Sequence, residues 1–251
     1  MNKFVRFDNG QKIAYGLLED DKVIAIDGSI YGKWEKTDEK YDLNQVKLLA
    51  PCEPTKVIGV GINYRSVISQ KGDPAPEEPI IFLKPSTSVI GPDESIVTPN
   101  GVKEMEYEAE PVVVIKDKIK NVSVEDAKKH VLGYTCGNDI TAKDFMIKGR
   151  PWTKGKSFDT FMPIGPCIVE GLDCDNLNIK MYHNGKLTQD GNTSDMVFNV
   201  SQIISFISHI MTLNPGDIIS TGTPPGKGKL AAGDVIEVEV EGIGKLTNRV
   251  V

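Results

Sequence analysis

Hydrophobic and polar residues alternate in short runs over the first fifty positions of the chain. Three such runs are separated by turn residues and lie at positions 4–7, 13–18 and 22–26. Short strands joined by turns such as Asp8-Asn9-Gly10 are typical of an antiparallel meander. We therefore predict a small N-terminal β subdomain over residues 1–50, followed by a main domain over residues 56–251.

The pattern changes in the main domain, where buried strands and a few helices are expected. Val57 to Gly61 reads as a buried strand, and a short polar segment that can form a helix follows it up to Lys71. Two further segments have the apolar spacing or capping residues of helices, Ser123 to His130 and Val200 to Met211. The remainder reads mostly as strands, with a hairpin at Asn184-Gly185. We therefore predict an α+β fold in which β-structure dominates and the sheet is mixed.

Gly59 and Gly61 form a Gly-x-Gly at the end of the first of these strands. A dinucleotide site would also need a third glycine and a long βαβ unit, and neither follows here. We interpret the two glycines as a tight exit from the strand.

Composition limits the classes of function that remain open. The 251 residues have a formal net charge of −6, which disfavours nucleic acid and anionic membranes as partners. No apolar run approaches the ~20 residues of a membrane span, and no apolar stretch follows the first residues, so we expect a cytoplasmic protein that acts on a small molecule. The cysteines have no metal-binding spacing and are expected to be buried thiols: Cys52, Cys136, Cys167 and Cys174.

An acidic ladder leads into the apolar stretch from Pro111 to Ile115. Its members occupy alternate positions: Glu104, Glu106, Glu108 and Glu110. In an extended chain alternate side chains share one face, so these carboxylates repel one another unless solvent, lysine, arginine or a metal ion neutralises them. Glu108 and Glu110 lie nearest the predicted core, where uncompensated charge is most costly. On this segment alone, a solvated edge strand is the simpler interpretation and a metal site the alternative.

Asp139 follows another apolar segment and is a third candidate ligand. Together with Glu108 and Glu110 it would make a set of oxygen donors, which suits hard cations such as Mg²⁺ or Mn²⁺, with Ca²⁺ possible in vitro. An Asn138-Asp139 turn that bonds its own backbone is the alternative for this residue.

Several separate motifs, taken in order along the chain, resemble the fumarylacetoacetate hydrolase family. They span about residues 56 to 251 and comprise Asn63-Tyr64, Pro79 to Pro85, Glu106 to Glu110, Gly133 to Asp139, Gly155 to Phe161, Gln189 to Thr193 and Ser220 to Pro224. The resemblance implies a mixed-sheet β-roll that is usually a homodimer. It also implies that Glu108, Glu110 and Asp139 hold Mg²⁺ or Mn²⁺, and that the substrate is an enolisable 2-oxo or 1,3-dioxo acid.

The same resemblance suggests roles for four further residues. Lys156 matches the active-site lysine of the family, although from the residues alone it is a surface lysine in a loop. Thr223 matches a position that helps to hold the substrate carboxylate, and otherwise marks a turn. Tyr64 lies in a matching motif and is a further candidate for substrate binding, with packing as its alternative role. Lys84 also lies in a matching motif, and charge balance is its alternative role.

The chain departs from the family pattern at the lid. Hydrolases and decarboxylases of the family typically carry a His-x-x-Glu pair there that activates water, and Val67 and Gln70 occupy these positions here. A family arginine and glutamine after the metal-binding aspartate are replaced by Lys143 and Met146, so we expect Lys143 to contact substrate in a different way.

These differences favour enolate chemistry without water activation. We predict a metal-dependent enzyme acting on a 2-oxo mono- or dicarboxylate, as an isomerase or tautomerase, or as a decarboxylase, with Lys156 as the catalytic residue that stabilises the developing enolate charge or relays a proton. Two alternatives remain open: a C–C bond hydrolase with an unrecognised base, and a catalytically silent protein that binds 2-oxo acids.

Overall fold

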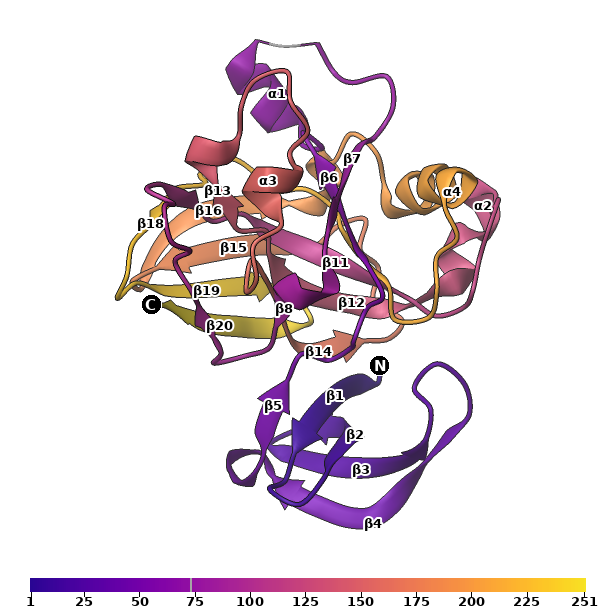
Figure 1. The fold of residues 1–251 in the computed structure, drawn as a ribbon. Helices are drawn as coiled ribbons and strands as arrows, with labels where there is room; N and C mark the ends of the chain where they lie inside the picture. Colours follow the sequence, from indigo (N-terminus) through magenta and orange to yellow (C-terminus); the bar gives the residue numbers. More distant parts are fainter. Residues whose placement is uncertain (73) are drawn as a thin grey trace.

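The computed structural model describes residues 1–72 and 74–251, and β-strands make up most of it (Figure 1). Its sheets contain both parallel and antiparallel neighbours, since β17 (Ile218–Ser220) runs parallel to β6 (Val57–Gly61) while β11 (Ala109–Ile115) and β12 (Val131–Asn138) are antiparallel. The predicted α+β fold with dominant mixed β-structure is therefore confirmed.

The largest sheet in the described residues has twelve strands and runs through both parts of the chain. Ten of its strands follow one another in the order β4 (Trp34–Asp42), β3 (Lys22–Gly28), β2 (Ile13–Glu19), β1 (Lys3–Asp8), β14 (Met162–Val169), β12, β11, β17, β6 and β7 (Ile80–Lys84). Two short strands pair at its side, β5 (Lys47–Leu49) with β1 and β8 (Val89–Ile90) with β14.

Two smaller sheets complete the main body within the described chain. One has the order β13 (Thr141–Ala142), β10 (Met105–Glu106), β18 (Lys229–Leu230). The other has the order β16 (Lys186–Asn192), β15 (Asn178–His183), β19 (Val235–Val240), β20 (Gly244–Val250), β9 (Ser95–Ile96). β15 and β16 form the hairpin predicted around Asn184-Gly185.

The N-terminal strands β1 to β4 form an antiparallel meander that lies below the main body in Figure 1. This meander is joined to the main body by backbone pairing, because Lys3 and Phe4 of β1 lie opposite Val169 and Ile168 of β14. Phe4 is completely buried, and its ring meets that of Trp34 edge to face at 5.5 Å between centroids.

Four short α-helices occur in the described residues: α1 (Arg65–Lys71), α2 (Val124–Ala127), α3 (Thr153–Lys156) and α4 (Val200–Ile210). α2 continues as a 3-10 turn to His130, so both predicted helices are confirmed, as is the short helix up to Lys71. α3 differs from the expected loop, because one helical turn carries the backbone from Trp152 to Lys156. None of these helices is long and apolar enough to span a membrane.

β11 lies between β12 and β17, and all seven of its residues are buried, which agrees with the continuous apolar run that starts at Pro111. The acidic ladder before it is not one continuous strand. β10 ends at Glu106 and β11 begins at Ala109, and in the gap Asn138 Oδ1 accepts a hydrogen bond from the Glu108 N–H at 3.0 Å. The break places Glu108 at the junction of two sheets.

Close packing explains the two glycines of β6. A Cβ atom at Gly59 would lie 2.1 Å from the Phe82 ring, and one at Gly61 would lie 2.2 Å from the Trp152 ring. The Phe82 and Trp152 rings therefore occupy the space that a side chain at Gly59 or Gly61 would need. This requirement for glycine differs from that of a phosphate-binding loop.

The predicted state of the cysteines is also confirmed. All four have free thiols and are buried in the described structure. Burial raises the pKa of Cys52 to about 12 and that of Cys167 to about 11, which keeps these thiols protonated and unreactive.

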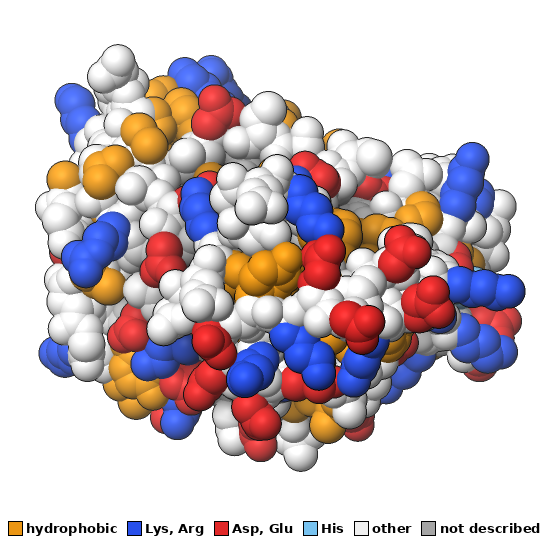
Figure 2. Space-filling model, turned by 90° about the horizontal axis from the view of Figure 1, so that it is seen from below, with side chains coloured by type: hydrophobic (Ala, Val, Ile, Leu, Met, Phe, Trp, Pro, Cys, Tyr) orange, Lys and Arg blue, Asp and Glu red, His pale blue; other side chains and the backbone are white. Residues whose placement is uncertain are grey.

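Positive and negative side chains alternate over the face seen from below, with hydrophobic side chains in small groups between them (Figure 2). Such a mixture keeps a protein dispersed without the one-signed field that attracts nucleic acid.

Candidate functional site

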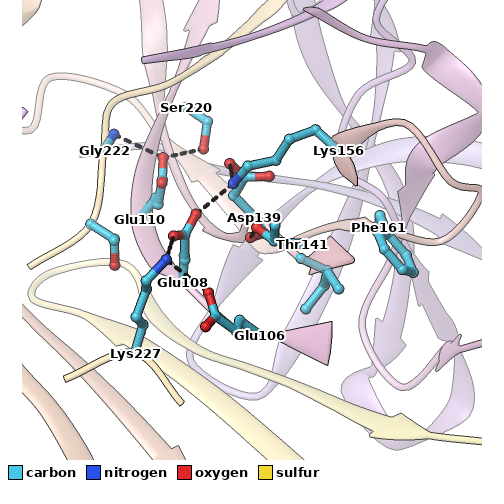
Figure 3. A network of polar contacts seen from close by, with 12 residues as sticks. Glu106, Glu108, Glu110, Asp139, Thr141, Lys156, Phe161, Ser220, Gly222 and Lys227 are labelled. Carbon is cyan, nitrogen blue, oxygen red and sulfur yellow. Dashed lines mark hydrogen bonds and ion pairs between the residues drawn. The ribbon is translucent and has the colours of Figure 1, made fainter. Parts of the chain in front are cut away.

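Three carboxylates converge where β11 begins and β12 ends. The two strands are antiparallel, with Ala109 opposite Asn138. Glu108, which directly precedes β11, and Glu110, its second residue, therefore lie beside Asp139, which directly follows β12. One oxygen from each carboxylate lies within 4.8 Å of the others (Figure 3). The structure thus brings together the three residues that the sequence suggested as metal ligands.

Glu110 is almost completely buried, as is Asp139. Its Oε2 atom accepts hydrogen bonds from Ser220 Oγ at 2.5 Å and from the Gly222 N–H at 2.8 Å. Burial, followed by the charges of Asp139 and Glu108, raises the pKa of Glu110 to about 8. Without a cation in the cluster, Glu110 is therefore mostly protonated at neutral pH, because three carboxylates this close cannot all be ionised.

Glu108 has the opposite behaviour because two lysines contact it. Its two oxygens lie 2.6 Å from Lys156 Nζ and 3.0 Å from Lys227 Nζ. Burial alone would raise the pKa of Glu108, but the charges of Lys156 and Lys227 outweigh burial and lower the pKa to about 2. Glu108 is thus ionised at every pH at which the protein is expected to work.

Lys156 joins two of the carboxylates. Its Nζ lies 2.6 Å from Glu108 Oε2 and 2.6 Å from Asp139 Oδ2. Burial opposes the charge of this ammonium, yet Asp139 and Glu108 raise its pKa above the ordinary lysine value. Lys156 therefore holds a proton beside the carboxylate cluster, and it projects there from α3.

Lys84 supports Asp139 from beneath. It is completely buried at the end of β7, where it forms an ion pair with Asp139 Oδ1 and donates to the carbonyl oxygens of Phe161 at 2.6 Å and Ile140 at 3.1 Å. Burial lowers the pKa of Lys84, and the charge of Asp139 opposes this effect. These contacts fix the orientation of Asp139 and assign Lys84 the charge-balancing role that was one of its two alternatives.

The chemistry of this donor set fits a metal ion. All three candidate ligands are carboxylates, and lysines now neutralise Glu108 and Asp139 while a proton neutralises Glu110. A divalent cation could replace that proton and take over part of the compensation by lysine. The cluster could therefore hold a metal ion.

The three carboxylates line a cavity of about 350 Å³. Thr223 and Lys143, two of the proposed substrate-binding residues, line it, as do Val67 and Gln70 of α1. Tyr64, the third, does not lie among the lining residues and is completely buried in the hydrophobic core. The structure thus gives Tyr64 the packing role that was its alternative.

The Thr223 hydroxyl is already engaged in the described structure. It donates a hydrogen bond to the Ala109 carbonyl oxygen at 2.8 Å and accepts one from Gln189 Nε2 at 2.9 Å. These bonds fix the loop after β17 against the start of β11, so Thr223 positions the cavity wall.

Part of the cavity wall is apolar. Phe82 and Trp152 contact each other edge to face at 5.5 Å between centroids, and Met146 lies in the same wall. Lys156 Nζ lies 5.1 Å from the centroid of the Phe82 ring, so the ammonium is held between the aromatic wall and the carboxylates.

Comparison with known proteins identifies the family. Residues 56–251 match the model described as fumarylacetoacetate (FAA) hydrolase C-terminal, and residues 2–51 match one described as Rv2993c-like, N-terminal. The chain belongs to the fumarylacetoacetate hydrolase family. The expectation drawn from the sequence motifs is therefore confirmed.

Relatives in this family carry the names of different enzymes. The chain is 42% identical over 221 residues to oxaloacetate tautomerase fahd2, mitochondrial, of Xenopus laevis, covering 83% of this chain and 69% of the relative. The crystal structure of 2-hydroxyhepta-2,4-diene-1,7-dioate isomerase from Mycobacterium marinum is similar with a TM-score of 0.94 and 36% identity, over 100% of this chain and 98% of the other. The maleylpyruvate hydrolase from Sphingobium sp. SYK-6 has a TM-score of 0.81 and 29% identity, with 99% of each chain covered.

Sequence reasoning missed Lys227. This residue lies in the loop between β17 and β18 and contacts Glu106 at 2.8 Å and Glu108 at 3.0 Å. No local signal in the sequence marks it, because its partners lie more than a hundred positions away in the chain.

Proposed function

We propose that the protein is a divalent-metal-dependent enzyme that interconverts tautomers or double-bond isomers of an enolisable 2-oxo carboxylate. The observation that carries this proposal is the position of Lys156, a buried ammonium 2.6 Å from both Glu108 and Asp139 at the base of the cavity. The oxygen donors favour Mg²⁺ or Mn²⁺, with Ca²⁺ as a substitute in vitro. When bound, the ion supplies a Lewis acid that polarises the keto oxygen of the substrate.

The residues of the chain would divide the remaining work among them. Glu108, Glu110 and Asp139 would hold the ion, and Lys84 would keep Asp139 oriented through its ion pair. Lys156 would hold a proton at Nζ and give it to one end of the enol system, and the neutral amine so formed would take up the proton lost from the other end, so that tautomerisation leaves the lysine unchanged. The apolar wall around Phe82 would exclude water from that proton transfer.

The lid residues favour isomerisation over hydrolysis. Val67 and Gln70 line the cavity, and neither side chain can accept a proton from water at neutral pH. Among the described lining residues there is no histidine, because His130, His183 and His209 all lie outside the cavity. A C–C bond hydrolase needs a positioned hydroxide, whereas a tautomerase or a decarboxylase does not.

The test is a comparison of metal-free and metal-loaded protein with oxaloacetate as substrate. We expect chelation to abolish enol–keto interconversion and Mg²⁺ or Mn²⁺ to restore it. Lys156→Ala should lower the rate by about 100-fold, the usual contribution of general acid–base catalysis. Lys154→Ala is the matched control, because Lys154 lies on the same helical turn but is exposed and points over the Phe145 ring.

Two results would contradict the proposal. One is full activity after chelation. The other is efficient metal-dependent cleavage of an acylpyruvate that Lys156→Ala leaves intact. Loss of carboxylate from oxaloacetate, measured as released CO₂, would show that the protein is instead a decarboxylase acting through the same enolate.

We also propose that the protein is a homodimer, as the family resemblance implies. Ile80 and Leu83 support this assignment, since both are exposed apolar side chains on the edge strand β7. Sedimentation velocity should give about twice the mass of one chain at micromolar concentration, and a monomer there would refute the proposal.

A further inference from the structure

Lys227 differs from the other lysines that contact the carboxylate cluster because it lies at the rim of the cavity. Its side chain is 38% exposed, compared with 5% for Lys156. Its Nζ lies 2.8 Å from Glu106 Oε2 and 3.0 Å from Glu108 Oε1, and Figure 3 shows it between these two carboxylates. A lysine in this position can contact both the cluster and a molecule that enters the cavity.

A second rim lysine shares one of these partners. Lys143 Nζ lies 3.6 Å from Glu106 Oε2, the same oxygen that Lys227 contacts, and its side chain is 46% exposed. Glu106 itself does not line the cavity. Glu106 therefore pairs with two ammonium groups that line the cavity, those of Lys143 and Lys227. Its single negative charge can neutralise only one of them.

The balance of charges around the cavity also favours an anionic ligand. Among the described lining residues there are four lysines and three carboxylates: Lys71, Lys143, Lys156, Lys227, Glu108, Glu110 and Asp139. Counting the two charged residues behind the wall, Glu106 and Lys84, gives five lysines and four carboxylates, and a divalent ion in the cluster would then leave an excess of three positive charges. A substrate with two carboxylates neutralises more of that excess than a monocarboxylate does.

We propose that Lys227, assisted by Lys143, forms a subsite for the second carboxylate of a 2-oxo dicarboxylate and selects such substrates over monocarboxylates. This inference rests on the proposed function, in which the 2-oxo end of the substrate binds at the carboxylate cluster. If Glu108 bound a metal ion, its ion pair with Lys227 would become weaker. The ammonium would then be available to an incoming carboxylate while Glu106 keeps it in place.

A purely structural role for Lys227 predicts something different. If its two ion pairs only anchored the loop after Pro225, loss of the ammonium would loosen the cavity wall for every ligand alike. A subsite changes the affinity only for ligands that carry the second carboxylate. A pair of ligands that differ in that group alone therefore separates the two roles.

The experiment is calorimetric titration of the Mn²⁺-loaded full chain with 2-oxopentanedioate and with 2-oxopentanoate, in which a methyl replaces the distal carboxylate. We expect Lys227→Met to weaken binding of the dicarboxylate by about tenfold and to change that of the monocarboxylate by less than about twofold. Lys227→Arg should restore most of the affinity. Lys229→Met is the matched control, because Lys229 lies two residues further on, is exposed and pairs with Glu104 outside the cavity.

The affinity for Mn²⁺, measured separately, reports on the cluster itself. It should not weaken in Lys227→Met, since loss of a neighbouring cation leaves Glu108 at least as available to the ion. If Lys227→Met weakened the binding of both ligands equally, or weakened the binding of neither, the proposed subsite would be refuted. Failure of the Mn²⁺-loaded wild-type protein to bind either ligand would overturn the proposed function itself.

Discussion

Binding of a divalent cation is expected to release a proton from Glu110. Burial and the neighbouring carboxylates raise the pKa of Glu110 to about 8, and a carboxyl group must be deprotonated to bind a metal ion. At about pH 7 roughly nine tenths of this group is therefore protonated in the metal-free protein, so each ion bound should displace about 0.9 proton. For the same reason the affinity should fall by about tenfold for each pH unit below about pH 8.

The proton release can be measured by titrating the protein with Mn²⁺ in buffers of different ionisation enthalpy. We expect the release at about pH 9 to be only about 0.1 proton per ion. Glu110→Gln should release almost none and bind the ion more weakly at every pH. Glu104→Gln is the matched control, because Glu104 belongs to the same acidic ladder but pairs with Lys229 outside the cavity. Proton release that is the same from about pH 6 to pH 9, or the same in Glu110→Gln, would refute this reasoning.

The same pKa predicts how stability depends on pH without metal. The pKa of Glu110 is raised on folding, so its protonated form stabilises the folded state below the ordinary value of 4.5, and this contribution is lost as the pH rises toward about 8. The stability of the metal-free wild type relative to Glu110→Gln should therefore decrease across this range and stay level above it. Chemical denaturation of both proteins at several pH values measures the difference, and a difference that grows with pH would contradict the expected direction.

Two further substitutions test the supports of the cavity. Lys84→Met should lower the free energy of unfolding by about 3 kcal/mol in the metal-free protein, because Asp139 Oδ1 and the carbonyl oxygens of Phe161 and Ile140 lose their buried partner while Lys156 still contacts Asp139 Oδ2. Denaturant titration measures the change, and an unchanged midpoint would show that Lys156 alone compensates Asp139. Gly61→Ala should cost about 1–3 kcal/mol because the new methyl would overlap the Trp152 ring, whereas Gly32→Ala, with no atom within 4 Å of its new Cβ, should be nearly neutral in the same thermal scan; equal effects of the two would contradict the packing argument.

Local patterns in the sequence were sufficient to predict several parts of the fold and the site. The apolar run of β11, the capped helices α2 and α4 and the hairpin at Asn184-Gly185 each depend on residues close together in the chain. The convergence of Glu110 with Asp139 was also accessible, because each carboxylate adjoins a strand that reads as buried.

Contacts between distant segments could not be predicted in this way. Lys227 and Glu108 are separated by 119 positions, and only the folded sheets bring them to 3.0 Å. The burial of Tyr64 likewise depends on the core that forms around it, which no local pattern specifies. The ladder of glutamates, finally, is interrupted between Glu106 and Ala109 because the backbone leaves one sheet and enters another.

Because β1 pairs with β14, the N-terminal meander covers an edge that the strands of the main body would otherwise leave open. Lys3 and Phe4 cover the stretch of β14 at Ile168 and Val169, whose other side already pairs with β12. Truncation of the meander would uncover apolar backbone edge there, and an exposed edge of this kind recruits strands from other molecules. The meander, which contributes none of the described residues that line the cavity, is thus expected to keep this sheet edge closed to other chains.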